Sequence, residues 1–488
     1  MASRKGINFK VIIKFLGILL ILLAAFMLLS LTWSLYYHET ASVRAFLLSS
    51  VLTAATGFLF YIAGLKHDHR NIRKKEGYLI VTLTWVSISL FGALPSWIAG
   101  AIPSYTDAFF ETMSGFTTTG ATILEDIEAV DKGLLFWRST THWLGGMGII
   151  VLTLAILPIL GVGGMQLFVA ESPGTTPQRL HPRIKQTATR LWGIYVGLTA
   201  TQTLLLMAGG MSFFHSINHA FSTLATGGFS TQNDSIAGYS PFIQYVIIFF
   251  MIMAGISFAL HYYLLKGQFR KVTGNEELRF YFSIIGIFTL ILTAGIFITQ
   301  QTGVEEAFRN SLFQTVAIAT TTGFITADYL QWSNFLWFLI FLLMFTGGCI
   351  GSTGGGLKMI RVLVLVKNTR MELKRLIHPM AVIPVRLDRR VIPQHIITNF
   401  LAFFLLYILL FFIGAAIMSF FDLDFESSIG ASIATLGNIG PAIGSLGPVD
   451  NYAHVPQVGK WILSFFMLLG RLEIFTVLLL FSPSFWKK

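Results

Sequence analysis

Four short stretches rich in Thr, Ser and Gly recur along a chain that is otherwise strongly hydrophobic. Aligned without gaps, they give four triplets: Thr118-Thr119-Gly120, Thr226-Gly227-Gly228, Thr321-Thr322-Gly323 and Thr435-Leu436-Gly437, the last followed by Asn438. Rings of backbone carbonyls can replace the hydration shell of a cation without placing full charges in a membrane. Glycine permits the backbone geometry and the close approach that such a ring needs. The triplets therefore predict a cation site built from four copies of one loop, with Thr hydroxyls adding oxygens or bracing it.

The composition indicates which kind of protein would carry such loops. Of the 488 residues, 54% are hydrophobic and only 12% are charged, whereas soluble domains carry about 25% charged residues. This balance is typical of a polytopic membrane protein. The single cysteine, Cys349, excludes an intrachain disulfide. No Ser/His/Asp or Cys/His arrangement suggests an enzyme, and His142, His219 and His261 are expected to be structural because nothing pairs them at metal-ligand spacing.

Apolar runs long enough to cross a bilayer, which takes about 20 residues, give ten candidate spans. They cover roughly 11–35, 43–65, 78–101, 134–160, 191–211, 241–265, 280–300, 333–363, 394–420 and 459–482. An even number places both termini on one side. Lys and Arg gather in every second connection and at the two ends, which predicts that these parts are cytoplasmic. Nucleic-acid binding is the weaker explanation of the net charge of +11.

The stretches also define a repeat. Each follows a segment too short to cross the membrane, at roughly 106–117, 213–225, 307–320 and 425–434, which predicts four re-entrant half-helices. The expected organisation is two spans outside the repeat (1–76), repeats 1 to 3 (77–170, 171–265 and 266–365), and a basic loop with repeat 4 (366–488). The predicted fold is an all-α membrane protein with four pseudo-symmetric units around one pore. Gly/Thr-rich helix packing is the alternative, and four copies in register argue against it.

With these motifs the chain resembles the Trk/Ktr/HKT superfamily of potassium transporters, and the two extra N-terminal spans resemble its bacterial Trk branch. The resemblance covers the whole chain. It implies a homodimer in the bacterial inner membrane with one pore per subunit, and a cytosolic nucleotide-binding partner of the TrkA type. It also implies that Gly120 favours potassium, because a Ser there accompanies sodium selectivity in the family. The fourth triplet departs most from the pattern, so we expect a lopsided, less discriminating filter.

A second glycine-rich stretch, TGGCIGSTGGGLK from Thr346, interrupts the predicted span 333–363. Glycine in a helix costs about 1 kcal/mol relative to Ala, so the helix is expected to break there. We predict a mobile gate below the filter, and the resemblance implies the same. Tight helix packing is the alternative, and the spacing does not fit a phosphate-binding P-loop. The predicted gate residues are Gly347, Gly348, Gly351, Ser352, Thr353, Gly354, Gly355, Gly356 and Lys358.

Arg471 lies in the middle of an apolar run, where a charge is functional by default. Neighbours two apart do not share a helix face, so Glu473 is an unsuitable partner and Arg471 is expected to face the pore as an electrostatic barrier. The resemblance supports this. The alternative is a salt bridge to a carboxylate on another span. Glu473 itself is expected to contact another helix or subunit.

Other charged groups leave two explanations open. Six acidic residues near the starts of the half-helices could concentrate cations at the outer mouth or cap the helices: Asp107, Glu111, Glu305, Glu306, Asp424 and Glu426. The basic loop 366–393 could contact anionic lipid or dock a cytosolic partner.

Together these features predict potassium (K⁺) translocation with no organic cofactor on this chain. The alternatives are a sodium or weakly selective path on the same fold, or a membrane scaffold or receptor without transport. The absence of an evident buried carboxylate relay favours channel-like passage over ion-coupled symport.

Overall fold

The computed structural model describes residues 7–65, 74–155 and 180–487, and nearly all of its regular structure is helical. Some predicted features fall elsewhere. The end of the predicted span 134–160 and several basic residues lie outside the described residues, namely Arg4, Lys5, Lys66, Arg70, Arg73, Arg179 and Lys488.

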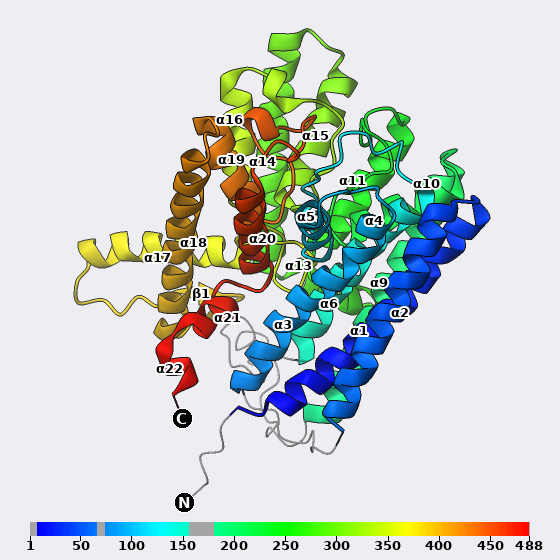
Figure 1. Ribbon diagram of the computed structural model, residues 1–488. Helices are drawn as coiled ribbons and strands as arrows, with labels where there is room; N and C mark the ends of the chain where they lie inside the picture. The colour runs from blue at the N-terminus through cyan, green and yellow to red at the C-terminus, as the bar shows by residue number, and fades with distance from the viewer. Residues whose placement is uncertain (1–6, 66–73, 156–179, 488) are drawn as a thin grey trace, which may run out of the picture.

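The first two helices pair along one edge of the molecule (Figure 1). They are α1 (Phe9–Tyr36) and α2 (Thr40–Ala63). Glycines let their backbones approach closely, because a Cβ added at Gly17 would lie 2.6 Å from the carbonyl oxygen of Gly57. The outer face of α2 exposes large apolar side chains, including Leu48, Val51 and Leu59. Such a face suits contact with lipid.

Four units follow. The first consists of α3 (Lys74–Gly92), α4 (Leu94–Ile98), α5 (Tyr105–Phe116) and α6 (Lys132–Ala155). The second consists of α9 (Leu180–Ala208), α10 (Phe213–Leu224), α11 (Pro241–Gly255), α12 (Phe258–Leu265) and α13 (Phe269–Thr273). The third consists of α14 (Glu276–Gln300), α15 (Val304–Ala319), η2 (Tyr329–Gln331), α16 (Asn334–Leu343) and α17 (Met359–Ile377). The fourth consists of α18 (Gln394–Phe420), α19 (Phe425–Leu436), η3 (Gly444–Leu446), α20 (Gln457–Arg471), α21 (Phe475–Leu478), η4 (Leu479–Phe481) and α22 (Pro483–Trp486).

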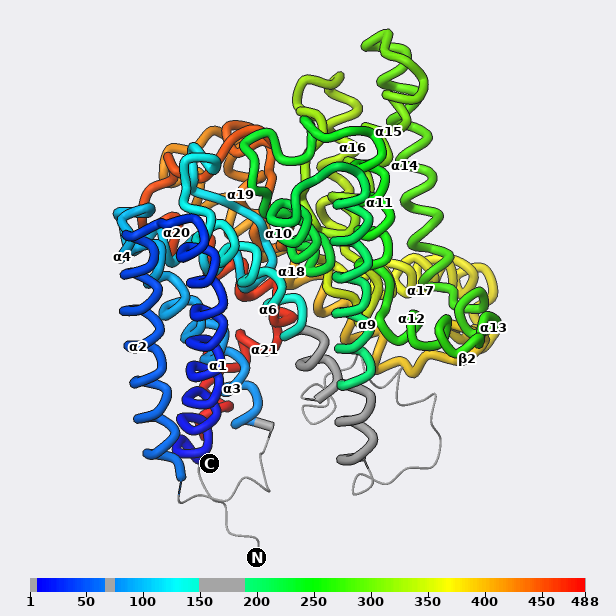
Figure 2. The backbone as a smooth tube through the Cα atoms, turned by 90° about the vertical axis from the view of Figure 1, so that its right-hand side faces the viewer, coloured from blue at the N-terminus to red at the C-terminus, as the bar shows by residue number. Residues whose placement is uncertain are grey.

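The predicted half-helices correspond to the short helices α5, α10, α15 and α19, which lie together in one half of the molecule (Figures 1 and 2). Side chains cap three of their N-termini: Ser104 accepts a hydrogen bond from the backbone of Asp107, Ser212 from that of His215, and Asp424 from that of Ser427. Such caps satisfy amide groups that have no partner inside the helix. The C-terminal halves of all four helices are buried.

Among the described residues, six helices are long and apolar enough to cross a membrane, or eight if each bent pair counts as one span. The ten-span topology remains a prediction. Two predicted spans are not continuous helices. The chain bends by 101° between α11 and α12, inside 241–265, and by 112° after Arg471, inside 459–482. The predicted break of 333–363 is confirmed, since residues 344–358 separate α16 from α17.

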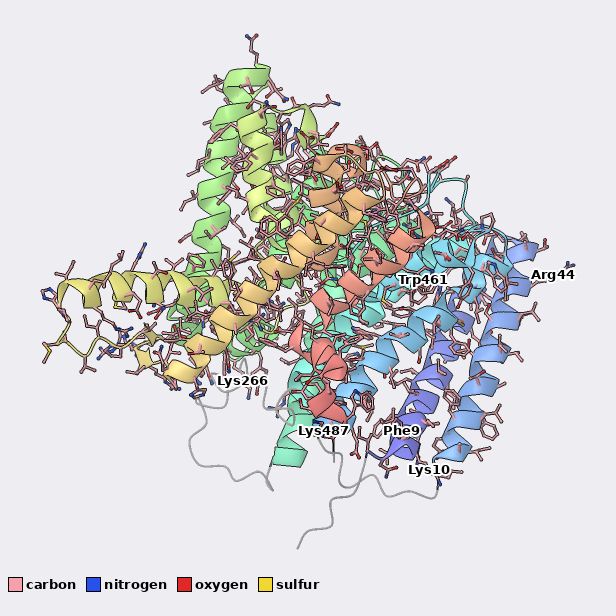
Figure 3. The ribbon with its side chains drawn as sticks, turned by 60° about the vertical axis from the view of Figure 1, so that its left-hand side comes forward. Phe9, Lys10, Arg44, Lys266, Trp461 and Lys487 are labelled. Carbon is pink, nitrogen blue, oxygen red and sulfur yellow. The ribbon has the colours of Figure 1, made fainter. Side chains whose placement is uncertain are left out.

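The fold is not purely helical. Residues Arg386–Leu387 (β1) and Arg390–Val391 (β2) pair as an antiparallel hairpin. Its turn residues Asp388 and Arg389 both have positive φ, as a type I′ hairpin turn requires. The helix α17 runs across the direction of α18 and projects sideways (Figures 1 and 3). Phe9 and Lys487 lie at the same end of the molecule, away from Arg44 and Trp461 (Figure 3).

Candidate functional site

The four Thr/Gly stretches share one backbone conformation. In the first, Thr118 and Gly120 have positive φ, and the amide of Thr119 donates to the carbonyl of Ser114 at 2.8 Å. The amides of Gly227, Thr322 and Ile439 make the same bond to the fifth residue upstream, also at 2.8 Å. The structural equivalents are therefore Thr118-Thr119-Gly120, Thr226-Gly227-Gly228, Thr321-Thr322-Gly323 and Asn438-Ile439-Gly440.

The glycines that end these triplets join the loops into a closed ring. A Cβ added at Gly120 would lie closer than 3.0 Å to the carbonyl oxygen of Gly227 in the next loop. The same relation runs from Gly228 to Thr322, from Gly323 to Ile439, and from Gly440 back to Thr119. Each loop thus packs the glycine of its triplet on the carbonyl of the middle triplet residue in the following loop. Four segments far apart in sequence form a ring of carbonyl groups with quasi-fourfold order.

This geometry corrects the predicted alignment of the fourth stretch by three residues. Thr435 and Leu436 belong to the last turn of α19, and the Thr435 hydroxyl donates to the Ala431 carbonyl at 2.6 Å. Gly437 caps that helix with an ordinary φ of −81°, so it is not the ring glycine. Asn438 instead takes the left-handed position of Thr118, a conformation that Asn adopts more readily than most residues.

Side chains brace the ring unequally. The Thr119 hydroxyl lies 2.7 Å from that of Thr117, and the Thr322 hydroxyl lies 2.8 Å from that of Thr320. The Asn438 amide donates to the Thr119 hydroxyl at 3.0 Å and to the Met467 carbonyl at 2.8 Å. The middle residues of the second and fourth triplets are Gly and Ile, which carry no hydroxyl. The ring is therefore asymmetric in its second and fourth parts.

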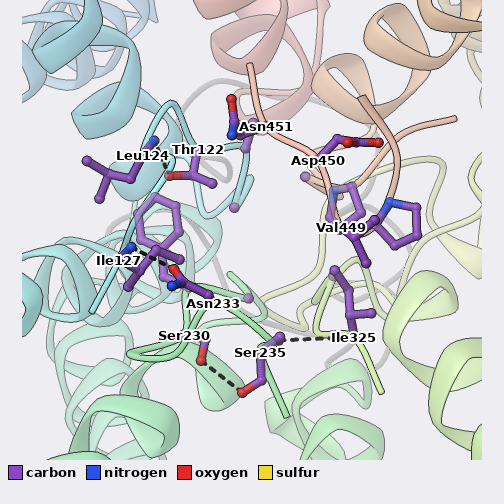
Figure 4. Close-up of a pocket in the computed structure, with 18 of the residues that line it drawn as sticks. Thr122, Leu124, Ile127, Ser230, Asn233, Ser235, Ile325, Val449, Asp450 and Asn451 are labelled. Atoms are coloured by element: carbon purple, nitrogen blue, oxygen red, sulfur yellow. Dashed lines mark hydrogen bonds between the residues drawn. The ribbon is translucent and has the colours of Figure 1, made fainter. Parts of the chain in front are cut away.

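Above the ring lies a cavity of about 130 Å³ (Figure 4). Its lining includes all four ring glycines together with polar residues of the loops that follow them, namely Thr122, Glu125, Gln232, Asn233, Asp450 and Asn451. Sequence reasoning missed Glu125, which follows its ring glycine by five residues, and Asp450, which follows its ring glycine by ten. Nearby, the Asn233 amide donates to Asp126 at 3.0 Å and holds the pKa of that carboxyl below its ordinary value.

None of the six acidic residues predicted near the outer mouth lines this cavity. Four of them have partners elsewhere. Asp424 caps α19. Asp107 pairs with Lys460 at 2.6 Å, and Glu305 with Arg309 at 2.9 Å. Glu111 pairs with Arg138 at 2.8 Å. Of the six, Asp424 thus fits the capping explanation, and Asp107, Glu111 and Glu305 form ion pairs.

The pair between Glu111 and Arg138 is buried beside the ring and ties its first two strands together. Glu111 also accepts from the amide of Ile123 at 2.9 Å, just after the first triplet. Arg138 donates to the carbonyl of Ser230 at 3.2 Å, just after the second. Its guanidinium lies 4.0 Å from the ring centroid of Phe229. The short distances give this pair the geometry that a buried ion pair needs to offset desolvation.

The three histidines are held as structural groups. His142 stacks on Phe229 with a centroid distance of 4.0 Å and lies 3.3 Å from the hydroxyl of Ser222. His219 and His261 each contact a backbone carbonyl at 2.8 Å. No group of three or more His, Cys, Asp or Glu within the described ranges could hold a metal ion.

The glycine-rich loop 344–358 lies against the helix ends beneath the ring. The Thr353 hydroxyl donates to the carbonyl of Leu224, the last residue of α10, at 2.9 Å. The amide of Gly355 donates to the hydroxyl of Thr321 at 2.7 Å. A Cβ on Gly355 would lie 2.6 Å from the carbonyl oxygen of Gly437, so no larger residue fits without movement. Lys358 donates back to the carbonyl of Gly354 inside the loop. The loop thereby contacts the second, third and fourth units.

Arg471 connects the same loop to the first unit. It is 2% exposed, and its guanidinium donates to the carbonyl of Thr353 at 2.6 Å and to that of Gly145, in α6, at 2.9 Å. Within the described part of the chain its hydrogen-bond partners are backbone carbonyls and not a carboxylate, which gives no support to the alternative of a salt bridge to another span. Glu473 pairs with Arg361 of α17, which confirms that it contacts another helix.

Comparisons with known proteins identify the family. A family model described as "Cation transport protein", TrkH, matches residues 38–488. The chain is 40% identical to the Trk system potassium uptake protein TrkH of Halomonas elongata and 41% identical to that of Escherichia coli strain K12, covering 99% of this chain and 100% of each relative.

A solved structure agrees. The crystal structure of the potassium transporter TrkH from Vibrio parahaemolyticus matches with a TM-score of 0.90 and 37% identity, covering 99% of this chain and 100% of that one. The chain belongs to the TrkH family of cation transport proteins.

Proposed function

We propose that this chain carries K⁺ across the bacterial inner membrane through the ring of four loops. The observation that carries the proposal is the closed ring, in which each terminal glycine packs on the middle carbonyl of the next strand. Carbonyl oxygens of this kind can take the place of the water around K⁺. The C-termini of α5, α10, α15 and α19 precede the ring, and their partial negative charge favours a cation. The relatives named as potassium uptake proteins support the choice of ion.

The filter in this proposal consists of the first three predicted triplets and Asn438-Ile439-Gly440. The hydroxyls of Thr119 and Thr322 are bonded to neighbouring hydroxyls, so we assign them to bracing the ring. A sodium or weakly selective path is the second candidate. The absence of a hydroxyl at Gly227 and Ile439 favours it, because two strands of the ring lack that brace.

The loop 344–358 acts as the gate in this proposal. Its contacts with the ends of α10, α15 and α19 support a closed position directly under the filter. Arg471 adds a buried positive charge bonded to that loop, which raises the electrostatic cost for a cation that passes.

The chain is further proposed to form a homodimer of ten-span subunits with four re-entrant helices and both termini in the cytoplasm. A TrkA-type nucleotide-binding partner would contact the basic segment 366–393. The relatives' designation as parts of a "Trk system" supports a partner protein. Passage is proposed to be channel-like.

The test is growth of a bacterial strain without its own K⁺ uptake systems, on limiting K⁺, with its TrkA-type partner present. The unmodified chain should restore growth and rubidium (Rb⁺) uptake. At equal abundance in the membrane, Gly323→Ser should lower the ratio of Rb⁺ uptake to Na⁺ uptake. No rescue and no uptake by a correctly inserted chain would favour a scaffold or receptor and end the transport proposal.

A further inference from the structure

A buried carboxylate beside the gate loop has no part in the function proposed above. Glu277 lies in the first turn of α14 and is 3% exposed. One of its oxygens, Oε1, accepts two backbone hydrogen bonds: from the amide of Ile350 at 2.7 Å and from that of Ile360 at 3.1 Å. Ile350 lies in the first half of the loop 344–358, and Ile360 lies just after it.

The two amides lie in different structural settings, and each donates its hydrogen bond to the same oxygen. Ile360 is in the first turn of α17, where amides have no partner inside the helix. Ile350 lies in an irregular segment next to the buried Cys349. A negative group is also favourable at a helix N-terminus. Glu277 therefore caps α17 and holds the first half of the loop through one atom.

The rest of the loop is held by backbone and by the filter. The amide of Cys349 donates to the carbonyl of Gly255 at 2.8 Å, and that of Phe258 donates to the carbonyl of Gly351 at 3.1 Å. Both bonds come from the bend between α11 and α12. Among the described residues, Glu277 is thus the acidic side chain outside the loop that hydrogen-bonds to the loop's backbone.

We propose that Glu277 is the positioning residue of the gate loop, holding it closed by accepting the amides of Ile350 and Ile360. This inference rests on the proposed gate function. Removal of the carboxylate would leave two buried amides without an acceptor, which destabilises the closed position relative to any position in which water reaches them. Hydrogen bonding is the property that matters, so Glu277→Gln, whose amide oxygen can accept both bonds, should retain the closed loop.

The chain carries a reporter for this motion. Cys349 is its single cysteine, is fully buried and adjoins Ile350. The first measurement is the rate at which a water-soluble maleimide labels Cys349 in purified, reconstituted protein. Glu277→Ala should raise the rate about tenfold, which corresponds to about 1.4 kcal/mol in the opening equilibrium. Glu277→Asp, shorter by one methylene, should also raise it, and covers the case in which the Ala variant fails to fold.

Two variants serve as controls. Glu277→Gln should label within about twofold of the parent, since a 1 kcal/mol difference would already exceed fivefold. Glu276→Ala is the matched neighbour, because the Glu276 carboxylate pairs with Lys367 rather than with the loop. The bond from its backbone amide to Asp388 is kept in the variant. Its labelling should equal that of the parent. Parent-like labelling of the Ala and Asp variants, or a Gln variant that labels as fast as Ala, would overturn the inference.

Rb⁺ uptake by the same proteoliposomes separates this inference from the function on which it rests. Uptake that rises with labelling in Glu277→Ala and Glu277→Asp supports both the positioning role and the gate. Faster labelling with unchanged uptake would overturn the gate-positioning role, since the anchored loop would then not control passage. If the parent takes up no Rb⁺ while the Glu277 variants change the labelling rate as expected, the transport proposal is contradicted. The contact between Glu277 and the loop would still be established.

Discussion

Replacement of Gly440 by Ala tests the corrected register of the fourth loop. Gly440 has a φ of 94°, and an added Cβ would lie 2.6 Å from the carbonyl oxygen of Thr119 and 2.8 Å from the carbonyl carbon of Gly120. The left-handed backbone alone costs a residue with a Cβ roughly 1–2 kcal/mol. The clash adds to this energetic cost, because both atoms belong to the backbone of the first loop of the ring. At about 1.4 kcal/mol per factor of ten, we expect a loss of K⁺ over Na⁺ preference of roughly tenfold.

The assay is Rb⁺ uptake into proteoliposomes in competition with K⁺ and Na⁺, with Gly437→Ala as the matched control three residues away. Gly437 has an ordinary φ, and its added Cβ would lie closest to the Ile433 carbonyl of its own helix, at 2.8 Å. That variant should lose stability while it keeps the ion preference. Gly323→Ala, which lies in the ring under either register, is the positive control.

Two results would refute this reasoning. If Gly437→Ala changes the ion preference and Gly440→Ala does not, the gapless alignment is right and the ring assigned from backbone geometry is wrong. If Gly323→Ala and Gly440→Ala both leave the preference unchanged in folded protein, the ring does not select the ion.

Two further substitutions follow from the buried charges. Arg138→Met leaves Glu111 buried without its partner and should cost about 3–5 kcal/mol of stability, which is measured as a lower melting temperature in detergent. A melting temperature equal to the parent's would show that the ion pair between Glu111 and Arg138 does not stabilise the first two loops. Arg471→Gln removes charge-assisted bonds worth about 1.5–3 kcal/mol each from the Thr353 and Gly145 carbonyls, and should raise Rb⁺ uptake several-fold. Unchanged or slower uptake would contradict its role as a barrier bonded to the gate loop.

Much of the site could be predicted from sequence because its signals are local. A helix too short to cross a membrane, followed by Thr and Gly, specifies a helix C-terminus and a left-handed turn. The structure has helices where all four were predicted. The break between α16 and α17 was equally evident, since six glycines in ten residues cannot continue a helix at low cost.

The fourth loop was misaligned because two residue types can fill one backbone position. Left-handed φ is common for Gly and accessible to Asn, so an alignment on Thr followed by Gly ends the fourth triplet at Gly437 and places Asn438 after it. The register becomes evident in the backbone geometry and in contacts such as that between Gly440 and the first loop, which joins residues more than 300 positions apart. The bends after Gly255 and after Arg471 were not predicted, because each lies within an apolar run long enough to be taken for one continuous span.

The partners of charged groups also needed the structure. Glu473 and Arg361 lie 112 positions apart, and so do not appear as a pair in sequence. Asp107 and Glu111 look like free acids at a helix start, yet each meets a cation from another helix. Glu277 carries no motif in the sequence, although its oxygen accepts the amide of Ile350 in the loop 344–358.

The most direct test of the central claim is anomalous scattering from crystals grown in Rb⁺. We expect a peak enclosed by the four loops that carry the carbonyls of Thr119, Gly227, Thr322 and Ile439. That peak should be lost or weakened in Gly440→Ala. A structure in which Rb⁺ is absent from the ring, while the same protein transports Rb⁺ in vesicles, would contradict it and move the selective site elsewhere in the molecule.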